Sequence, residues 1–286
     1  MRLFRVVQIE NRSIPEGEQA VEILGAAFSE ELAKLEPTRR QRVLRKVVMA
    51  ALGSIPWVGG FMAALASIKD DESQAKTDNL QRQWLEEHGR KIQELARTLT
   101  EMIGRLESFG DDVKQRIESE EYLALIRKGF RQWDQADTEE KKKLIANLLT
   151  NAGATNITSD DVIRLFLDWI NLYHEIHFSV IREIYRGPGI TRARIWRNIH
   201  GEFPREDSAE EDLFKLLIRD LTMGGVIRQH RETTYDGKFI AKKPSRSGVS
   251  TGTMKSAFDD QEPYELTELG RQFVHYTMEE VVPRIA

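Results

Sequence analysis

Hydrophobic positions in the first two-thirds of the chain recur every three or four residues, the spacing of one face of an α-helix. This pattern predicts helices over 21–35, 74–109, 113–133, 138–151 and 159–185. Thr138, followed by two glutamates, has the character of a helix N-cap. The first two-thirds of the chain is therefore expected to be helical.

The long helix over 74–109 carries a heptad-like apolar seam. Its members are Leu85, His88, Ile92, Leu95, Leu99, Met102, Leu106 and Phe109. Only a partner helix, in the same chain or in another subunit, can bury such a stripe. We expect a homo-oligomer, because a long unburied seam would be exposed to water.

The pattern of apolar positions changes after Gly187-Pro188-Gly189. Shorter predicted helices are followed there by the alternation of apolar and polar residues that is typical of strands. Thr191 and Ser208 are predicted caps of two helices, the second ending at Gly224-Gly225. The expected elements that follow are a strand over 226–234, a turn over 235–238, a return strand over 239–242, a loop over 244–263 and a short strand leading into a helix over 264–276, capped by Thr267. The fold class is therefore mainly α, with a multi-helix domain over 1–175 and an α+β domain over 176–286.

Residues 47–68 form the most distinctive segment, VVMAALGSIPWVGGFMAALASI, which contains no charged side chain. It is long enough for one membrane-spanning helix, but the central Pro56 and the nearby glycines favour a turn. We predict an apolar hairpin of two short helical arms. Its candidate membrane-contacting residues are Ile55, Pro56, Trp57, Val58, Phe61 and Met62, and its basic flank is Arg39, Arg40, Arg42, Arg45 and Lys46.

Two interpretations of this hairpin stay open. A core hairpin covered by the surrounding helices is the common arrangement in soluble proteins. A membrane-active hairpin is favoured by apolar residues on all sides, by Trp57 at the tip, and by basic residues that attract anionic lipid. Neither arm is long enough to span a bilayer alone.

Composition narrows the function classes. The 286 residues are 40% apolar and 31% charged, with a formal net charge of −4 and no cysteine. These values fit a foldable protein, disfavour a globally nucleic-acid-coating one and exclude thiol chemistry. The short, interrupted apolar run at the N-terminus is not a secretory signal, so we expect a cytoplasmic protein that joins membranes on activation.

No catalytic or cofactor motif is recognisable, so we predict a protein that is not an enzyme and needs no cofactor. His174 and His177 could share one helix face and hold a divalent metal, but no third ligand is indicated. A structural role for the two histidines and no metal site is the prediction.

The order of elements over about 177–286 resembles the winged helix-turn-helix family. The residues that carry the resemblance are Asp220-Leu-Thr-Met-Gly-Gly-Val-Ile-Arg228 and Tyr264-Glu-Leu-Thr-Glu-Leu-Gly270. The resemblance implies a long basic wing loop over 228–263, and its candidate binding residues are Arg228, Arg231, Lys238, Lys242, Lys243 and Arg246. These cations favour contact with nucleic-acid phosphates, whereas the acidic start of the preceding helix opposes it. Nucleic-acid binding and protein docking by this domain both stay open.

A covered apolar hairpin beside long amphipathic helices also resembles the membrane-acting, pore-forming-like effectors of bacterial abortive-infection and anti-phage systems. This resemblance covers about 18–110 and implies a protein stored with its hairpin covered until a trigger or partner releases it. We expect such an effector, controlled by the C-terminal domain. The alternative is a DNA-binding transcriptional regulator whose helical domain serves oligomerisation.

Overall fold

A computed structural model of the chain describes residues 39–61, 79–110, 113–155, 157–205, 207–230, 235–236, 258 and 262–278, with side chains in the first two stretches described from 44 and 88 onward. The described residues are mainly helical, as the sequence predicts, with three short strands. They divide into two compact units, one ending at Asp168 and the other beginning at Trp169, within one helix. The predicted helix over 21–35 lies outside the described residues.

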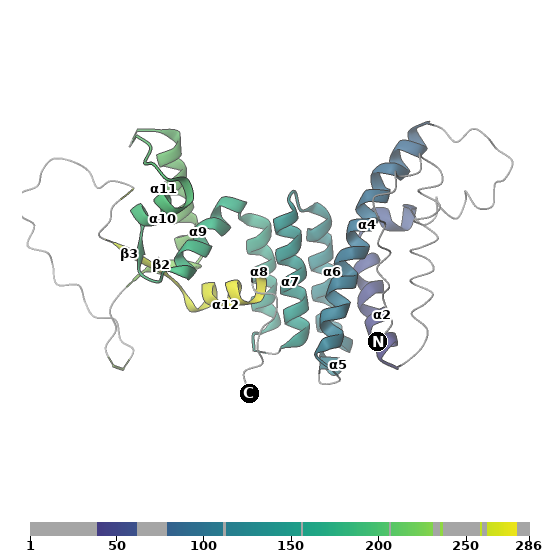
Figure 1. Cartoon of the computed structure of the whole chain (residues 1–286). Coiled ribbons are helices and arrows are strands. Elements are labelled where there is room, and N and C mark those ends of the chain that lie inside the picture. Colours follow the sequence, from purple (N-terminus) through teal and green to yellow (C-terminus); the bar gives the residue numbers. More distant parts are fainter. Residues whose placement is uncertain are drawn as a thin grey trace, which may run out of the picture. The chain divides into compact units, whose positions relative to one another are not determined.

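The first unit is entirely helical in its described part (Figure 1). Its helices are α2 (Arg39–Leu52), α4 (Asn79–Ser108), α5 (Lys114–Glu118), α6 (Glu120–Gln135), α7 (Glu139–Ala154) and the first part of α8 (Asp160–Leu172). Residues 56–61 are also helical. Thr138 caps α7 as predicted, because its side chain accepts a hydrogen bond from the Lys141 backbone N–H.

The predicted helix over 113–133 is wrong as a single element, because it is divided into α5 and α6 at Ser119. Ser119 has an extended backbone, and its side chain accepts from the Tyr122 N–H at 3.2 Å. A serine that offers the next helix a cap competes with helix continuation. The polar residue inside the apolar pattern therefore starts a new helix.

Helix α7 is the centre of the first unit, since its last eleven residues are almost all buried. It lies beside α6, and the two backbones approach closely at Gly129, where an added Cβ would meet the Leu149 side chain at 2.7 Å. The seam of α4 also packs on α7. The buried seam residues of α4 are His88, Ile92, Leu95, Leu99, Met102 and Leu106.

Polar contacts fix α4 on α7. Lys142 donates to the two carboxylate oxygens of Glu94 at 2.7 and 2.8 Å, and Arg105 donates to Asn147 at 2.7 Å. Burial disfavours the charged form of Lys142, but hydrogen bonds to Glu94 and Glu139 outweigh it and raise the Lys142 pKa. The described part of the seam thus has its partner helix in the same chain, so the seam by itself no longer requires a second subunit.

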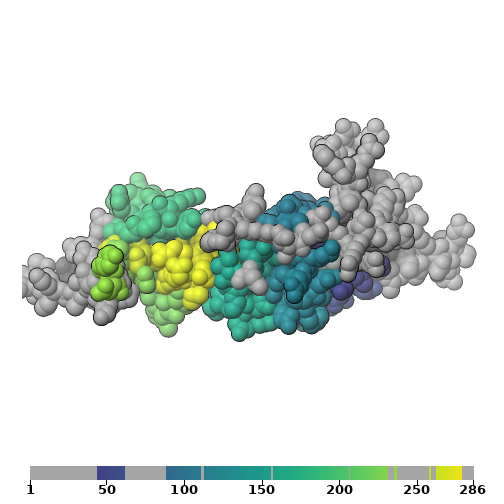
Figure 2. All heavy atoms as spheres, turned by 90° about the horizontal axis from the view of Figure 1, so that it is seen from below, coloured from purple at the N-terminus to yellow at the C-terminus, as the bar shows by residue number. Residues whose placement is uncertain are grey.

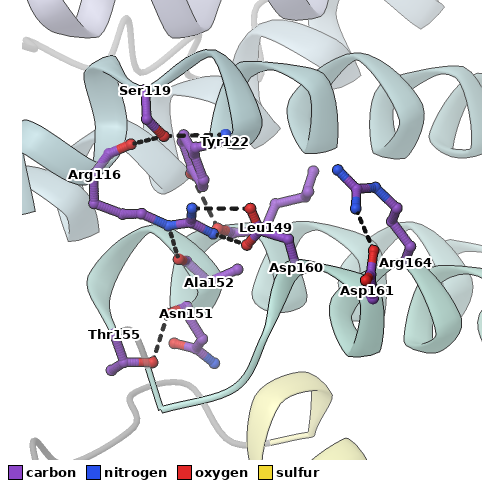
Figure 3. Close-up of polar contacts among 10 residues, drawn as sticks. All are labelled: Arg116, Ser119, Tyr122, Leu149, Asn151, Ala152, Thr155, Asp160, Asp161 and Arg164. Atoms are coloured by element: carbon purple, nitrogen blue, oxygen red, sulfur yellow. Dashed lines mark hydrogen bonds and ion pairs between the residues drawn. The ribbon is translucent and has the colours of Figure 1, made fainter.

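Arg116 ties together four helices of the first unit (Figure 3). Its guanidinium donates to the Ala152 carbonyl at the end of α7 and to both carboxylate oxygens of Asp160 at the start of α8. It also lies over the ring of Tyr122 in α6, 5.5 Å from the centroid. Tyr122 donates to the Leu149 carbonyl at 3.0 Å, and burial raises its pKa, so the phenol stays a neutral donor.

The second unit contains helices on one small antiparallel sheet. After the end of α8 come α9 (Glu175–Arg186), β1 (Ile190–Thr191), α10 (Arg192–His200), α11 (Ala209–Met223), β2 (Ile227–Gln229), β3 (Pro263–Leu266) and α12 (Glu268–Thr277). The strand order is β1-β3-β2, with Ile190 opposite Tyr264 and Arg228 opposite Glu265. The predicted caps Thr191, Ser208 and Thr267 are confirmed, each accepting a backbone N–H.

The predicted helix over 159–185 is wrong as one element, because α8 ends at Leu172 and α9 starts at Glu175. His174 has an extended backbone, and its N–H donates to His177 Nδ1 at 3.1 Å. The histidine side chain thus satisfies a free N–H at the start of α9, as the glutamate of a capping box does. Periodicity alone does not reveal such a cap.

Aromatic side chains form the core of the second unit. Phe273 of α12 packs edge-on against Trp169 with centroids 5.5 Å apart and stacks with Phe178 of α9 at 6.3 Å. Helix α12 also presents an outer surface, shown in yellow in Figure 2. Its exposed residues include Glu268, Leu269 and Arg271.

Candidate functional site: the apolar hairpin and the second unit

The described part of the predicted apolar hairpin is interrupted at residues 53–55, directly before Pro56. Helix α2 ends at Leu52, the N–H groups of Gly53 and Ser54 donate to carbonyls of the last turn, and residues 56–61 are again helical. Proline suits the first turn of a helix because it has no N–H to leave unpaired. Met62 and the rest of the second arm lie outside the described residues.

One side of the hairpin is buried. Ile55, Val58 and Phe61 are only 2%, 4% and 1% exposed, and Val47 and Ala51 of α2 are buried as well. Helix α2 packs on α5 and α6, so the buried side lies within the first unit. Burial of this kind fits both interpretations of the hairpin, because a stored membrane hairpin and a core hairpin are both covered.

The other side of the hairpin is accessible and carries no charge. Met49 is 56% exposed, and Gly53, Pro56, Gly59 and Gly60 are exposed as well. From Val47 to Phe61 no charged residue occurs on either side. A helix on the surface of a soluble protein ordinarily carries charged or polar residues on its outward face, so this surface is unusual.

The tip of the hairpin is held by a polar contact that we call the Trp57 latch. The indole Nε1–H of Trp57 donates to Asp134 Oδ1 near the end of α6 at 2.6 Å, across 77 residues of sequence. The Trp57 ring also meets the ring of His88 in an edge-on contact, with centroids 5.1 Å apart. A hydrogen bond to a carboxylate is about twice as strong as a neutral one, so the latch fixes the tip.

The basic flank lies on α2. Arg45 and Lys46 are exposed, and Lys46 Nζ lies 3.8 Å from a carboxylate oxygen of Glu118. Arg39, Arg40 and Arg42 belong to the start of the same helix. None of the described helices is both long and apolar enough to cross a bilayer.

In the second unit, the predicted wing begins with Arg228 in β2. Its Nε donates to Glu265 Oε1 at 2.7 Å across the β2–β3 pair, and His230 Nδ1 lies 2.7 Å from the other oxygen. The charge of Arg228 is therefore partly neutralised by Glu265, although the Arg228 side chain is 41% exposed. Arg231, Lys238, Lys242, Lys243 and Arg246 lie outside the described residues.

The ionisation of Glu265 makes the contribution of this ion pair to the free energy of unfolding depend on pH. Burial disfavours its charged form, but the hydrogen bonds and charges of His230 and Arg228 outweigh burial and lower the Glu265 pKa below its ordinary value of 4.5. A carboxylate with a lowered folded-state pKa stabilises the fold above its unfolded pKa and loses that contribution as the pH falls through the folded value.

We therefore expect Glu265→Gln to lower the free energy of unfolding at neutral pH, with the difference from the wild type disappearing as the pH falls well below 4.5. Urea unfolding at a series of pH values from about 7 to 3 measures this difference. Glu268→Gln is the control, since the Glu268 side chain is 72% exposed in a surface pair with Arg271 and should change little at any pH. A Glu265→Gln difference that stayed constant with pH would contradict the assignment.

The two histidines of the predicted structural pair lie at the start of α9. His177 is buried, its Nδ1 accepts the His174 N–H, and its Nε2 lies 3.9 Å from Asp220 Oδ2. Tyr173 stacks on the His177 ring at 5.1 Å, and burial, with a smaller effect of Asp220, raises the Tyr173 pKa to about 12. Within the described residues, no three or more histidine, aspartate or glutamate side chains are grouped to hold a metal ion.

One residue of the long loop has a role that sequence reasoning missed. Phe258 packs against Trp196, Phe203 and Phe214, with ring centroids 5.2–5.6 Å apart. The sequence feature that could have indicated this packing is a single phenylalanine in a loop rich in serine, glycine and threonine. Asp134, the partner of Trp57, had no signal, because nothing local relates residues 77 positions apart.

Comparisons of the chain with protein-family models, with curated proteins and with solved structures found no match.

Proposed function

We propose that the chain is a non-enzymatic effector of the bacterial abortive-infection or anti-phage type, which stores an apolar hairpin against its helical unit and inserts it into anionic membrane on release. The observation that carries the proposal is the uncharged outward side of the hairpin, from Val47 to Phe61, on a segment whose inward side is also apolar. A segment without charge on any side can enter lipid without first burying an ion.

We further propose that the second unit is a winged helix-turn-helix that docks a partner. The order α9, β1, α10, α11, β2, β3, α12 and the strand order β1-β3-β2 support this assignment. The loop between β2 and β3 then occupies the position of the wing. A partner that binds this unit would be the trigger, provided that it prefers the released state.

The energetics of release are compatible with such control. Each of Val58 and Phe61 gains about 1.5–3 kcal/mol from burial, and lipid can replace this gain. The Trp57 hydrogen bond to a charged acceptor adds about 1.5–3 kcal/mol that lipid does not replace. Removing the latch should therefore favour the released state by about tenfold to a hundredfold.

The test is leakage of a trapped dye from anionic liposomes. Asp134→Ala removes the acceptor of the latch, so we expect it to leak dye severalfold faster than the wild type, with a shift of Trp fluorescence. Asp161→Ala is the matched control, because the Asp161 side chain is 91% exposed in a surface pair with Arg164 on α8. It should leak like the wild type.

A second substitution, added to Asp134→Ala, separates membrane insertion from partial unfolding. Gly59 is exposed, and an added Cβ meets no atom within 4 Å, so a side chain fits there in the folded state. Gly59→Glu places a charge on the outward apolar side and should abolish leakage, whereas Gly59→Ala should preserve it. Equal leakage by these two variants, or no leakage by any variant, would overturn the membrane proposal.

The alternative, a DNA-binding regulator, has less support. The wing residue Arg228 is paired with Glu265, and the helix in the base-reading position, α11, begins with Glu210, Glu211 and Asp212. Acidic residues repel phosphates, and base readout needs hydrogen-bonding side chains on the outward face. Three exposed positions on the outward face of α11 are instead occupied by Leu213, Leu216 and Met223.

A further inference from the structure

Helix α11 buries one face completely. Phe214, Leu217, Ile218 and Leu221 are at most 2% exposed. Phe258 from the long loop stacks on Phe214, so this described part of the loop packs on the inner side of α11. The inner face is therefore part of the core of the second unit.

The opposite face of α11 also carries apolar residues. Leu213 and Leu216 are 43% and 41% exposed, and Met223 is 79% exposed. With Ala209 and Asp220, these residues follow one another at alternating intervals of four and three, the spacing of a single stripe along a helix. We call Ala209, Leu213, Leu216 and Met223 the outer stripe. Asp220 interrupts the outer stripe between Leu216 and Met223. Scattered exposed leucines are ordinary, but exposed apolar residues aligned on one face of a helix mark an interaction surface.

The charges beside the outer stripe are mainly negative. Glu210 and Asp212 are exposed in the first turn, and Asp220 is half-buried farther along. Lys215 is paired with the buried Glu211 at 2.7 Å, and Arg219 Nε lies 4.0 Å from Asp220 Oδ1, so each cation of α11 has a carboxylate of the same helix beside it. The surface is thus an apolar stripe flanked by carboxylates, which complements a basic amphipathic segment and repels nucleic acid.

We propose that the outer stripe of α11 is a docking site for a basic amphipathic helix of a partner protein, one with apolar residues at intervals of three and four and with lysine or arginine beside them. Helix α11 has 15 residues, so it is about 22 Å long, enough to lie along about four turns of a partner helix. This inference rests on the docking role proposed for the second unit and names the chemistry of the partner. It does not depend on membrane insertion.

The test uses the full chain and a fluorescent probe peptide of about 20 residues, with leucine at alternating three- and four-residue spacing and lysine at flanking positions. Fluorescence anisotropy measures its binding. We expect saturable binding that weakens at least tenfold in Leu213→Gln/Leu216→Gln and that weakens, with a shallower salt dependence, in Glu210→Gln/Asp212→Asn. Leu269→Gln is the matched control, because Leu269 is 37% exposed on α12 of the same unit and should bind normally.

Two further probes make the result decisive. The same peptide with glutamate in place of lysine should bind at least tenfold more weakly, and a labelled DNA duplex should not compete. Equal loss of binding in Leu269→Gln and Leu213→Gln/Leu216→Gln, or no saturable binding of the lysine peptide, would overturn the proposal. DNA binding that is unchanged in the leucine variants would assign the second unit to nucleic acid instead. Liposome leakage is measured separately, so failure of one proposal leaves the other standing.

Discussion

Replacing Val58 and Phe61 together by glutamate is expected to unfold the first unit. Both side chains are almost fully buried on the inward side of the hairpin, where each substitution removes apolar burial and introduces a charge without a partner. Unpaired buried charges belong to the most destabilising class of substitution, about 4 kcal/mol or more each. Two of them approach the whole stability of a typical domain, about 5–15 kcal/mol.

Circular dichroism with urea unfolding measures this loss, and size-exclusion chromatography detects the aggregation that follows it. The matched control is Gly59→Glu, which places the same charge on the neighbouring, exposed position. We expect this variant to unfold within about 1 kcal/mol of the wild type, because exposed surface substitutions are usually mild. A double variant as stable as the wild type would show that the inward side of the hairpin does not pack in the core.

The second large effect is expected at Gly270 in the first turn of α12. An added Cβ there would lie 2.1 Å from the backbone oxygen of Val226, which also accepts the Thr267 N–H at 3.0 Å. No side-chain rotation relieves a clash with a backbone atom, so α12 must move away from Val226, the residue before β2. We expect Gly270→Ala to lower the free energy of unfolding by about 3 kcal/mol, in the range of severe overpacking.

Gly104→Ala is the opposite case and serves as control. Gly104 lies within α4, and an added Cβ meets no atom within 4 Å. The alanine removes the helix penalty of glycine, so the variant should be about 0.5–1 kcal/mol more stable than the wild type. Hydrogen exchange assigns each effect to its unit, with the loss expected in α12 and β2. If both alanine variants changed the free energy of unfolding in the same direction, the close approach of Gly270 to Val226 would not be what destabilises Gly270→Ala.

The local features of this protein are determined by its sequence. Thr138, Thr191, Ser208 and Thr267 each cap a helix where the sequence predicts it, because a hydroxyl at an N-cap needs only the backbone three residues ahead. The break directly before Pro56 is local as well, because proline and the neighbouring glycines act on their own backbone. Two predicted single helices were wrong because a side chain accepts a hydrogen bond from a backbone N–H at the start of a new helix. These acceptors are Ser119 at the start of α6 and His177 at the start of α9.

The tertiary structure decided which surfaces face one another. The apolar seam of α4 predicted that some helix covers it but not which one. In the fold that helix is α7 of the same chain. The latch partner Asp134, the Phe258 anchor and the exposed outer stripe of α11 all depend on residues distant in sequence. Apolar periodicity tells which residues avoid water, whereas the choice among several apolar faces is made by the summed packing of the whole unit. That is why the sequence determined most of the helices of this protein, and only its fold showed which apolar residues stay exposed.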